Sequence, residues 1–419
     1  MHPSKRIIGS KGGLLVGRKI VLGICGSIAA YRAPDIARGL MRQGAEVICV
    51  MSGGAAQFIS ADLLRWATGN EVITGITSRA EHVELCGKAA ERGGAAAGKW
   101  GARADGRADL LLIAPATSNA ISEIAHGYDR GAVTMMAATA LGSGVPIVVV
   151  PAMHEGLYDN PVLRENVKTL EKAGVIFVPP RLEDEKAKVA EVDEIADWAV
   201  RAIAEKKGEA VLHGKKIVVT AGATREFIDD VRFISNPSSG RMGVEIAREA
   251  WRRGAEVVLV AGHLEVEAPS HLKMAGVESV REMLAAVVRE RAGAYVLAAA
   301  AGDFEVKRMR GKMDSKKAAR ISLSPAPKIA DLVRKKYPKA KLVIFKAEVG
   351  ARGLEEKARK RMKECGADVA VANIVAHGKG FGGAENGKYE AIILSGRGRR
   401  KKFGGTKQEA AAEILKAIF

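Results

Sequence analysis

The sequence twice begins the same succession of apolar and glycine-rich segments, and this repeat restricts the fold more than any other feature. The segment GRKIVLGICGS at 17–27 leads to RQGAEVICV at 42–50, and GKKIVVTAGAT at 214–224 leads to RRGAEVVLV at 252–260. A short β-branched run, glycine, an amphipathic stretch and a second apolar run are typical of a strand, helix and strand on a parallel sheet. The sequence therefore predicts an α/β protein with two Rossmann-like parallel-sheet domains.

Chain length and the stretch between the two repeats place the domain boundary. A chain of 419 residues is long enough for two domains that each bury a core. Before the second repeat, Asp193 is expected to cap a helix, which a polar segment with glycines then follows. We therefore expect a basic N-terminal tail over 1–17, a first domain over 18–204, a linker over 205–213 and a second domain over 214–419.

Further apolar runs predict most of the remaining strands. Most of these runs do not alternate with polar residues, as expected for strands that are covered on both faces. They are ADLLLIAP (108–115), VPIVVVPAM (145–153), GVIFVPP (174–180), AYVLAAAAGDF (294–304), KLVIFKAE (341–348) and DVAVANI (368–374). The Gly/Ala-rich segment 87–109 is expected to form a long loop. The segment SGRGRRKKFGG at 395–405 is either a solvated basic hairpin or a nucleic-acid patch.

Composition narrows the class of protein and its surroundings. The 66 Lys and Arg residues exceed the 48 Asp and Glu residues by 18, which suits nucleic acid, a membrane surface or small phosphorylated ligands. The four cysteines lie far apart without a CxxC pair, so neither a disulfide framework nor a cysteine zinc site is indicated. No apolar run reaches the roughly 18 residues of a spanning helix, and no secretory signal is present. We expect a cytoplasmic protein with no membrane partner.

Two predicted strand ends in the first half suggest a phosphate site. GICGSIAAYR (23–32) places small residues at the end of a strand and Ser27 where the next helix begins, and APATSN (114–119) gives a second hydroxyl-rich turn. Glycines allow a ligand to approach the main chain, and backbone N–H groups at a helix start bind phosphate. Because the pattern is not GxGxxG, it favours a mononucleotide crevice over a dinucleotide site.

Two further segments in the first half hold polar and aromatic side chains. His82 lies in EHVEL, and a single histidine is more often structural than catalytic. The segment PAMHEGLYDNP (151–161) gathers a histidine, a tyrosine and an asparagine between two prolines beyond a predicted strand. Loops at strand ends are where α/β proteins keep their binding and catalytic residues.

Together, GSIAAYR, EHVEL, ADLLLIAPATSN and PAMHEGLYDNP resemble the FMN-dependent cysteine decarboxylase family, in its phosphopantothenoylcysteine decarboxylase branch. The resemblance implies a flavodoxin-like first domain, His82 as the active-site histidine, and Met153 and His154 at the substrate, with His154 on its carboxylate. In that family FMN oxidises the cysteinyl thiol of the substrate, carbon dioxide leaves, and the reduced flavin returns its hydride. The residues that would surround FMN are Gly26, Ser27 on the phosphate, Ser52, Phe58, Ala114, Thr117, Ser118 and Asn119.

The first half departs from that family pattern at two places. His154 stands where the bacterial pattern has asparagine, a variation of the archaeal-type branch. The segment RLEDEKAKVAE (181–191) contains no cysteine, although the family usually carries a flap cysteine after the preceding strand. The proton donor that completes the reduction of the enethiol is therefore not assigned by the resemblance.

The second half holds a long loop that is rich in polar residues. In TAGATREFIDDVRFISNPSSGRMG (220–243), Asn236 and the Pro-Ser-Ser-Gly turn after it stand before a predicted helix, which favours anion binding. AAAAGDF (298–304) ends a strand with Asp303, and Lys312 follows in GKMDSKK. A carboxylate and a lysine of this kind suit Mg²⁺ and a triphosphate, although a solvated surface loop is an equal alternative.

The 220–243 segment resembles the signature of phosphopantothenate–cysteine ligase. Such ligases activate the phosphopantothenate carboxylate as an acyl-nucleotidyl anhydride, which the cysteine nitrogen then attacks. The resemblance implies that Arg232 and Asn236 bind and stabilise the acyl intermediate, that Asp303 binds the nucleotide and Mg²⁺, and that Lys312 acts in the second step. Phe345 would line the base pocket.

The ligase pattern also differs at its triphosphate residues. Arg361 stands where the pattern has a lysine, and Cys365 replaces a second lysine. Lys360 or Lys363 is the expected substitute.

The two resemblances together predict a bifunctional enzyme of coenzyme A biosynthesis. It would join cysteine to 4′-phosphopantothenate with CTP and decarboxylate the product to 4′-phosphopantetheine, with FMN and Mg²⁺ as cofactors. The positive charge then serves small anions, and no nucleic-acid partner is needed. Decarboxylases of this family form trimers and the ligase domains pair as dimers, so we expect a trimer-based homo-oligomer, a hexamer or a dodecamer.

Three alternatives remain open from the sequence. An FMN-binding prenyltransferase or another flavoprotein would share the first half but would not need SNPSSGRMG. A flavodoxin-like electron-transfer module would leave His82 and His154 without a task. A basic nucleic-acid binder would show strongly salt-dependent binding to DNA.

Overall fold

The computed structural model describes residues 2–88, 106–183, 186–314, 320–375, 388–396 and 398–419. These residues form two compact units that divide between Glu209 and Ala210, inside the stretch predicted as a linker. Most of the predicted loop 87–109 lies outside the described residues. Within the described part of the chain, no helix is both long and apolar enough to cross a membrane.

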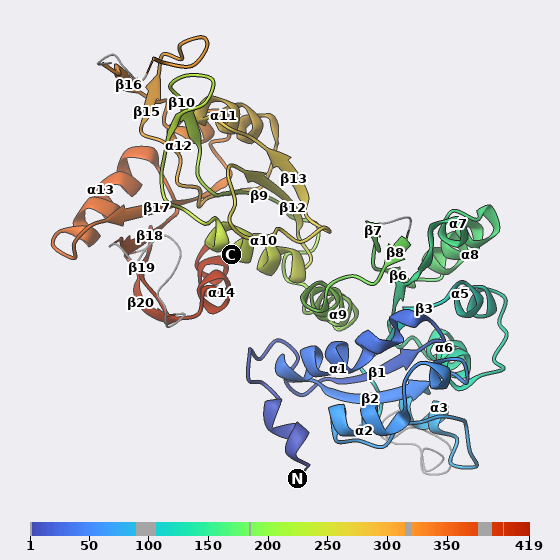
Figure 1. Cartoon of the computed structure of the whole chain (residues 1–419). Helices are drawn as coiled ribbons and strands as arrows, with labels where there is room; N and C mark the ends of the chain where they lie inside the picture. The colour runs from blue at the N-terminus through green and yellow to red at the C-terminus, as the bar shows by residue number, and fades with distance from the viewer. Residues whose placement is uncertain (1, 89–105, 184–185, 315–319, 376–387, 397) are drawn as a thin grey trace. The chain divides into compact units, whose positions relative to one another are not determined.

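The first unit is built on five parallel strands in the order β2-β1-β3-β4-β6 (Figure 1). This is the flavodoxin-like order, in which the chain first adds a strand on one side of β1 and then continues on the other side, so that the strand order reverses between β1 and β3. The strands are β1 (Lys19–Ile24), β2 (Glu46–Met51), β3 (Leu110–Ala116), β4 (Ile147–Pro151) and β6 (Ile176–Phe177). The prediction of a flavodoxin-like first domain is confirmed.

Helices cover both faces of this sheet, which is why its strands are apolar throughout. Ile20 and Leu22 of β1 pack in the core beneath α1 and α9, and Val21 packs on the other face with α5, α6 and α8. The helices are α1 (Ala33–Arg42), α2 (Ala61–Thr68), α3 (Glu81–Cys86), α5 (Ser118–Ala125), α6 (Ala132–Ser143), α7 (Glu155–Tyr158), α8 (Pro161–Lys172) and α9 (Val192–Lys206). The short 3₁₀ turns are η1 (Pro3–Ile7), η2 (Ile28–Arg32) and η3 (Ala55–Gln57).

Three local features of the first unit differ from the expectations. The N-terminal stretch packs on the unit, because Leu15 is buried and its N–H donates to the Gln43 carbonyl. Helix α9 begins at Val192, so Asp193 lies in its first turn instead of capping it. Strand β6 covers only Ile176–Phe177 of the seven residues predicted.

A three-stranded antiparallel sheet follows the last parallel strands. It consists of β5 (Met153–His154), β7 (Arg181–Glu183) and β8 (Lys186–Lys188), in the order β5-β8-β7. His154 is paired with Lys186 in this sheet. The segment that lacks the flap cysteine thus lies beside the histidine-containing loop.

The second unit is an eight-stranded mixed sheet in the order β13-β12-β9-β14-β17-β18-β19-β20. The first six strands of this order are parallel and follow the Rossmann arrangement, with the change of direction between β9 and β14. The last two strands add an antiparallel hairpin. The strands are β9 (Lys216–Ala221), β12 (Glu256–Ala261), β13 (Lys273–Gly276), β14 (Ala294–Leu297), β17 (Lys341–Glu348), β18 (Val369–Ile374), β19 (Tyr389–Ser395) and β20 (Arg400–Gly405).

Both faces of the second sheet are covered as well, which confirms the predicted two-domain α/β fold. One core contains side chains of α11, α12 and α13, and α10 packs with α14 and against β9 and β12. The helices are α10 (Arg241–Arg252), α11 (Val280–Arg289), α12 (Ile329–Lys336), α13 (Leu354–Cys365) and α14 (Lys407–Ile418).

Two short antiparallel ribbons extend the second unit near one end of its sheet (Figure 1). They are β10 (Arg225–Phe227) with β11 (Phe233–Ser235), and β15 (Phe304–Val306) with β16 (Leu323–Pro325). The ribbons contact each other through β10 and β15. The loop 220–243 therefore contains one ribbon, and Lys312 lies in the segment that joins the two strands of the neighbouring ribbon.

Candidate functional site

In the first unit, the loops after β1 and β2 meet at the carboxyl end of the sheet. A Cβ atom built on Gly26 would lie 2.7 Å from the carbonyl carbon of Gly54. The two backbones are therefore in direct contact and leave no room for a side chain at position 26. In the second loop, Ser52 Oγ accepts a hydrogen bond of 3.2 Å from the N–H of Ala55. Both loops therefore present backbone groups and serine hydroxyls to a ligand, close to the point between β1 and β3 where the strand order reverses.

The loops after β3 and β4 approach the same edge. Ser27 Oγ lies 3.3 Å from the carbonyl oxygen of Ala152, which follows β4. Thr117 Oγ1 accepts from the N–H of Ala120 and caps α5. Of the other predicted FMN residues, Ala114 is buried in β3, Ser118 is half-buried, and Phe58 and Asn119 are exposed. The crevice residues thus come from four strand ends.

His82 lies in the first turn of α3, outside these loops. Its side chain is half-buried, and its Nδ1 atom is buried without a hydrogen-bond partner among the described residues. A buried polar atom of this kind costs free energy unless it finds a partner. The Nδ1 atom is therefore suited to meet a ligand group or a group from another chain.

His154 is held at the start of α7. Its Nδ1 atom is 3.2 Å from the N–H of Gly156 and accepts that hydrogen bond, which fixes the ring while the residue stays exposed. Met153 is half-buried and packs against the core formed with α5, α6 and α8. Met153 and His154, both predicted to contact the substrate, are adjacent in the chain, but Met153 contacts the core and His154 is exposed.

The four cysteines are all buried. Burial raises the pKa of Cys25, Cys49 and Cys86 to about 12. Burial also raises the pKa of Cys365. A thiol with a raised pKa is a weaker acid near neutral pH, so none of the four is assigned as the proton donor.

In the second unit, three of the predicted ligase residues line one cavity of about 170 Å³. Thr220 at the end of β9 and Leu297 at the end of β14 form its floor, at the change of strand direction. Asp303, Phe345 and Arg361 line the same cavity. The cavity therefore brings together residues of the strands β9, β14 and β17, the loop residue Asp303, and residues of the helices α11, α12 and α13.

Two ion pairs set the charge in this cavity. Lys328 Nζ is 2.5 Å from Asp303 Oδ1, and Arg361 Nη2 is 2.7 Å from Asp331 Oδ1. The described residues contain no group of three or more His, Cys, Asp or Glu side chains that could hold a metal ion, and Asp303 is the acidic residue in the lining of this cavity. Lys328 lines the same cavity but is not among the residues predicted from the sequence. The sequence shows it only as a lysine directly before the segment that forms α12.

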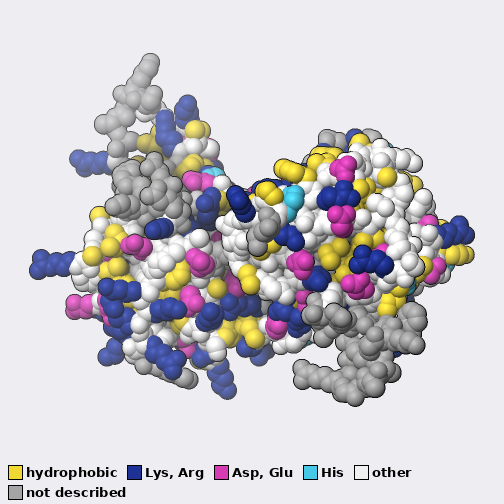
Figure 2. Space-filling model, turned by 90° about the horizontal axis from the view of Figure 1, so that it is seen from below, with side chains coloured by type: hydrophobic (Ala, Val, Ile, Leu, Met, Phe, Trp, Pro, Cys, Tyr) yellow, Lys and Arg dark blue, Asp and Glu magenta, His cyan; other side chains and the backbone are white. Residues whose placement is uncertain are grey.

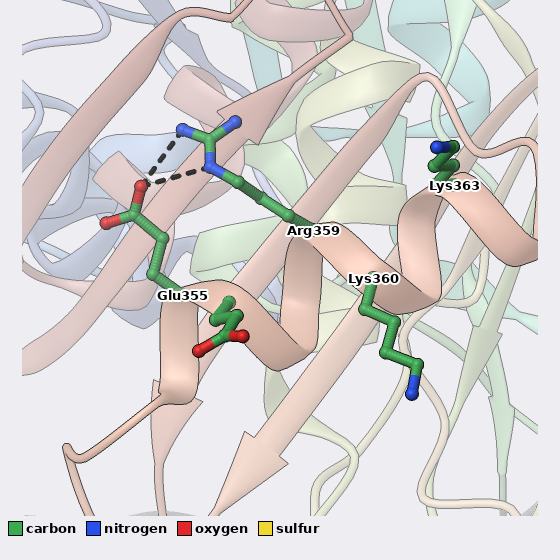
Figure 3. Close-up of a pocket in the computed structure, with 5 residues that line it drawn as sticks. Glu355, Arg359, Lys360 and Lys363 are labelled. Atoms are coloured by element: carbon green, nitrogen blue, oxygen red, sulfur yellow. Dashed lines mark hydrogen bonds and ion pairs between the residues drawn. The ribbon is translucent and has the colours of Figure 1, made fainter.

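The two lysines proposed to replace the triphosphate lysine lie elsewhere on α13. Lys360 and Lys363 line a separate hollow together with Glu355, Glu356 and Arg359. Figure 3 shows that both lysine side chains point away from the ion pair of Glu355 with Arg359. Because Arg361 alone of these basic residues reaches the cavity, it is the better candidate for a phosphate group.

Threonine side chains fold the strand-end loop around the cavity. Thr220 Oγ1 accepts from the N–H of Ala299 at 3.0 Å, and Thr224 Oγ1 accepts from the N–H of Gly302 at 2.9 Å. These bonds replace the sheet pairing predicted for this run, so β14 ends at Leu297. Asn236 Nδ2 donates to the carbonyl of Ala300 at 3.2 Å and therefore lies against the same loop.

Arg232 and Lys312 lie on the two ribbons, away from the cavity lining. Arg232 Nη1 is 2.7 Å from Asp229 Oδ2 and 3.3 Å from the carbonyl oxygen of Met313. Lys312 is exposed and precedes Met313 directly. The structure thus brings these two predicted residues to adjoining segments.

Comparison with known proteins identifies both units. Residues 9–204 match the Flavoprotein family, and residues 212–419 match the C-terminal domain of the DNA/pantothenate metabolism flavoproteins. The coenzyme A biosynthesis bifunctional protein CoaBC of Thermococcus kodakarensis is 43% identical over 427 residues, covering 100% of this chain and 99% of that protein. The CoaBC protein of Methanocaldococcus jannaschii is 31% identical, covering 100% and 97%.

A solved C-terminal domain of a CoaBC protein is 34% identical, covers 49% of this chain and 95% of its own, and gives a TM-score of 0.41. The full-length identity to the Thermococcus protein settles the family, because both sequences are matched almost from end to end. The chain therefore belongs to the family of bifunctional coenzyme A biosynthesis proteins, CoaBC, with a flavoprotein domain followed by a pantothenate-metabolism domain.

Proposed function

We propose that this chain joins cysteine to 4′-phosphopantothenate with CTP in its second unit and decarboxylates the product to 4′-phosphopantetheine with FMN in its first. The observation that carries the proposal is the cavity at the change of strand direction in the second unit, where Asp303, Phe345 and Arg361 meet. An aromatic ring, a carboxylate and a guanidinium suit the base, metal and phosphates of a nucleotide.

In the ligase reaction, the residues of this chain bind and orient the reactants. Arg361 offers planar donors to a phosphate, and Lys328 beside Asp303 adds a second positive charge at the cavity. Mg²⁺ usually keeps most of its ligands as water and phosphate oxygens, so a single carboxylate from Asp303 fits it. Asn236 lies against the loop that lines the cavity and offers its amide to an acyl intermediate.

In the decarboxylase reaction, the four strand-end loops would hold FMN. The close approach of Gly26 to Gly54 brings the loops after β1 and β2 together, so that one ligand could contact both, and the hydroxyls of Ser27 and Thr117 suit the phosphate of FMN. The Nδ1 atom of His82, which is buried without a hydrogen-bond partner in the described part of the chain, is a further polar group that a ligand could meet. FMN supplies the electron sink for this chemistry. His154 stays available to a substrate carboxylate through its exposed ring.

The charge of the chain favours small anions over nucleic acid. On the face seen in Figure 2, Lys and Arg side chains are interspersed with Asp and Glu instead of forming one continuous basic surface. The basic hairpin is also partly neutralised, since Arg400 pairs with Glu355 and Lys401 pairs with Glu413. Proteins that bind nucleic acid usually carry a basic face or stripe instead.

The expected assembly and compartment belong to the same proposal. Ile28, Tyr31 and Trp66 of the first unit are 72%, 62% and 57% exposed, and apolar side chains of this size favour contact with a second copy of the chain. A homo-oligomer built on trimers is the expected assembly, and the cytoplasm is the expected location.

One reaction tests both activities. The pure chain, supplied with FMN, is incubated with 4′-phosphopantothenate, cysteine, CTP and Mg²⁺, and products are identified by mass. Phosphopantetheine is the expected product. Accumulation of phosphopantothenoylcysteine would limit the activity to the ligase, and product with ATP but not CTP would correct the nucleotide. Absence of product with either nucleotide would refute the proposal.

A further inference from the structure

A fully buried carboxylate ties the signature loop of the second unit to the segment of Lys312. The Asp229 side chain is 0% exposed. Its Oδ1 accepts from the N–H groups of Val231 and Arg232, each at 2.7 Å. Its Oδ2 accepts from the Arg232 guanidinium at 2.7 Å and from the N–H of Met313 at 3.0 Å. Four donors on one carboxylate offset the cost of burying its charge.

The neighbouring carboxylate binds the other side of the same segment. Asp230 Oδ2 accepts from the N–H of Gly311 at 2.8 Å, and its Oδ1 accepts from Arg308 at 2.8 Å. The N–H of Asp230 donates back to the Gly311 carbonyl at 3.2 Å. Gly311 has a φ of +75°, a conformation that glycine adopts without strain. The turn is therefore held by hydrogen bonds without backbone strain at this residue.

Lys312 lies between these two anchors. The residue before it is bound to Asp230 and the residue after it is bound to Asp229. Its ammonium is exposed and, among the described residues, has no ion-pair partner, so it is available to a ligand. The residues around it, Arg308 and Met309 among them, are exposed and provide no core. Hydrogen bonds to the two aspartates therefore hold this backbone, together with the bond of 2.9 Å from the Met309 N–H to the Ile228 carbonyl and the bond of 3.3 Å from Arg232 Nη1 to the Met313 carbonyl.

We propose that Asp229 and Asp230 are positioning residues that fix the backbone on both sides of Lys312, and so determine where its ammonium meets the reacting acyl group. The proposal rests on the proposed ligase function, in which Lys312 acts in the amide-forming step. Displacing a reacting group by about 1 Å can cost about 100-fold in rate, so loss of an anchor should slow that step.

Asp230 gives the cleaner test, because Asp229 also holds the predicted site residue Arg232. Asp230→Ala removes both acceptor oxygens. Asp230→Asn keeps one carbonyl oxygen, which can still accept from Gly311 or Arg308. Glu413→Gln is the matched control, because Glu413 likewise pairs with two basic side chains, Lys401 and Lys416, but does so on α14.

The experiment measures the two half-reactions separately, as pyrophosphate release before cysteine is added and as phosphopantothenoylcysteine formed afterwards. For Asp230→Ala we expect the second rate to fall about 10- to 100-fold. Asp230→Asn should fall less, and Glu413→Gln should match the parent. Amide hydrogen exchange over 308–313 should become about tenfold faster in Asp230→Ala, since its anchor is lost.

A double-variant cycle separates positioning from general support of the fold. In a Lys312→Ala chain, adding Asp230→Ala should slow the amide-forming step no further, because the group that Asp230 positions is already gone. A double variant whose loss is the product of the two single losses would overturn the inference, as would unchanged exchange or unchanged amide formation in Asp230→Ala. A parent chain that forms no ligation product would instead refute the proposed function, and the inference with it.

Discussion

The contact of Gly26 with Gly54 supports a sharp prediction about the first unit. A Cβ atom on Gly26 would lie 2.7 Å from the carbonyl carbon, 2.8 Å from Cα and 3.0 Å from the carbonyl oxygen of Gly54. All three are backbone atoms, so no flexible side chain can yield. To reach the 3.4 Å at which ordinary contact begins, the two loops must separate by about 0.7 Å.

Gly26→Ala should therefore destabilise the first unit and weaken FMN binding together. Forcing an extra methyl group into a packed site typically costs about 1–3 kcal/mol. For a unit of this size each kcal/mol lowers Tm by about 2–4 °C, so we expect a fall of about 2–12 °C. If FMN contacts both loops as proposed, moving them apart should raise its Kd by about tenfold or more, with 1.4 kcal/mol per decade.

The assay is a titration of the apoprotein with FMN, followed by flavin fluorescence, together with thermal unfolding of the same samples. Gly53→Ala is the matched control, because Gly53 lies next to Gly54 in the loop after β2 and a Cβ there meets nothing within 4 Å. If Gly26→Ala binds FMN and unfolds as Gly53→Ala does, the two loops do not form the FMN crevice.

Three further predictions follow from the same structure. His82→Asn should abolish release of carbon dioxide while leaving ligation at the parent rate, as measured by mass spectrometry of the reaction mixture. In the folded protein at pH 8, Ellman's reagent should label none of the four buried thiols, and all four should react after unfolding in guanidinium; prompt labelling of the native chain would contradict their burial. Hydrogen bonding by the Met313 N–H lowers the pKa of Asp229, and the Arg308 guanidinium lowers that of Asp230. Their stabilising effect should be complete above the unfolded-state pKa of about 3.9 and lost as the pH falls through the lower folded-state values. The protection of amides 308–313, taken relative to their intrinsic exchange rates at each pH, should therefore fall only at acidic pH, and less in Asp229→Asn.

Local apolar pattern was sufficient to predict most of the sheet. KLVIFKAE at 341–348 is β17 without any shift of its bounds, because its residues are covered on both faces and need no partner beyond neighbouring strands. The Ala/Gly run after β14 was wrongly extended to 304 as strand. Its backbone N–H groups bind Thr220 and Thr224, almost 80 residues away in sequence, and no local pattern announces those partners.

The N-terminal stretch was misjudged for a related reason. Its composition is basic and polar, which is typical of a solvated tail, yet the N–H groups of Gly9 and Lys11 donate to the carbonyls of Met41 and Arg42 at the end of α1. Carbonyls at a helix end lack intrahelical partners, so a chain that passes them can be held by backbone bonds alone. Two apolar side chains add to these backbone bonds, since Leu15 is buried and Ile7 packs against the same core.

The candidate sites contain two kinds of residue. Some are proposed to contact a ligand, and others hold the backbone of those residues in place. The family resemblances named Asp303, Phe345 and Arg361, which line one cavity, because a ligand imposes residue types directly on the positions that touch it. Asp229 and Asp230 act on the backbone of a segment about 80 residues further along the chain. In sequence they are two acidic residues in a polar loop, and solvated surface is the simplest interpretation of such a pair. Only the fold shows that one of them is wholly buried and that both bind the turn of Lys312, so their role depends on geometry that no local pattern contains.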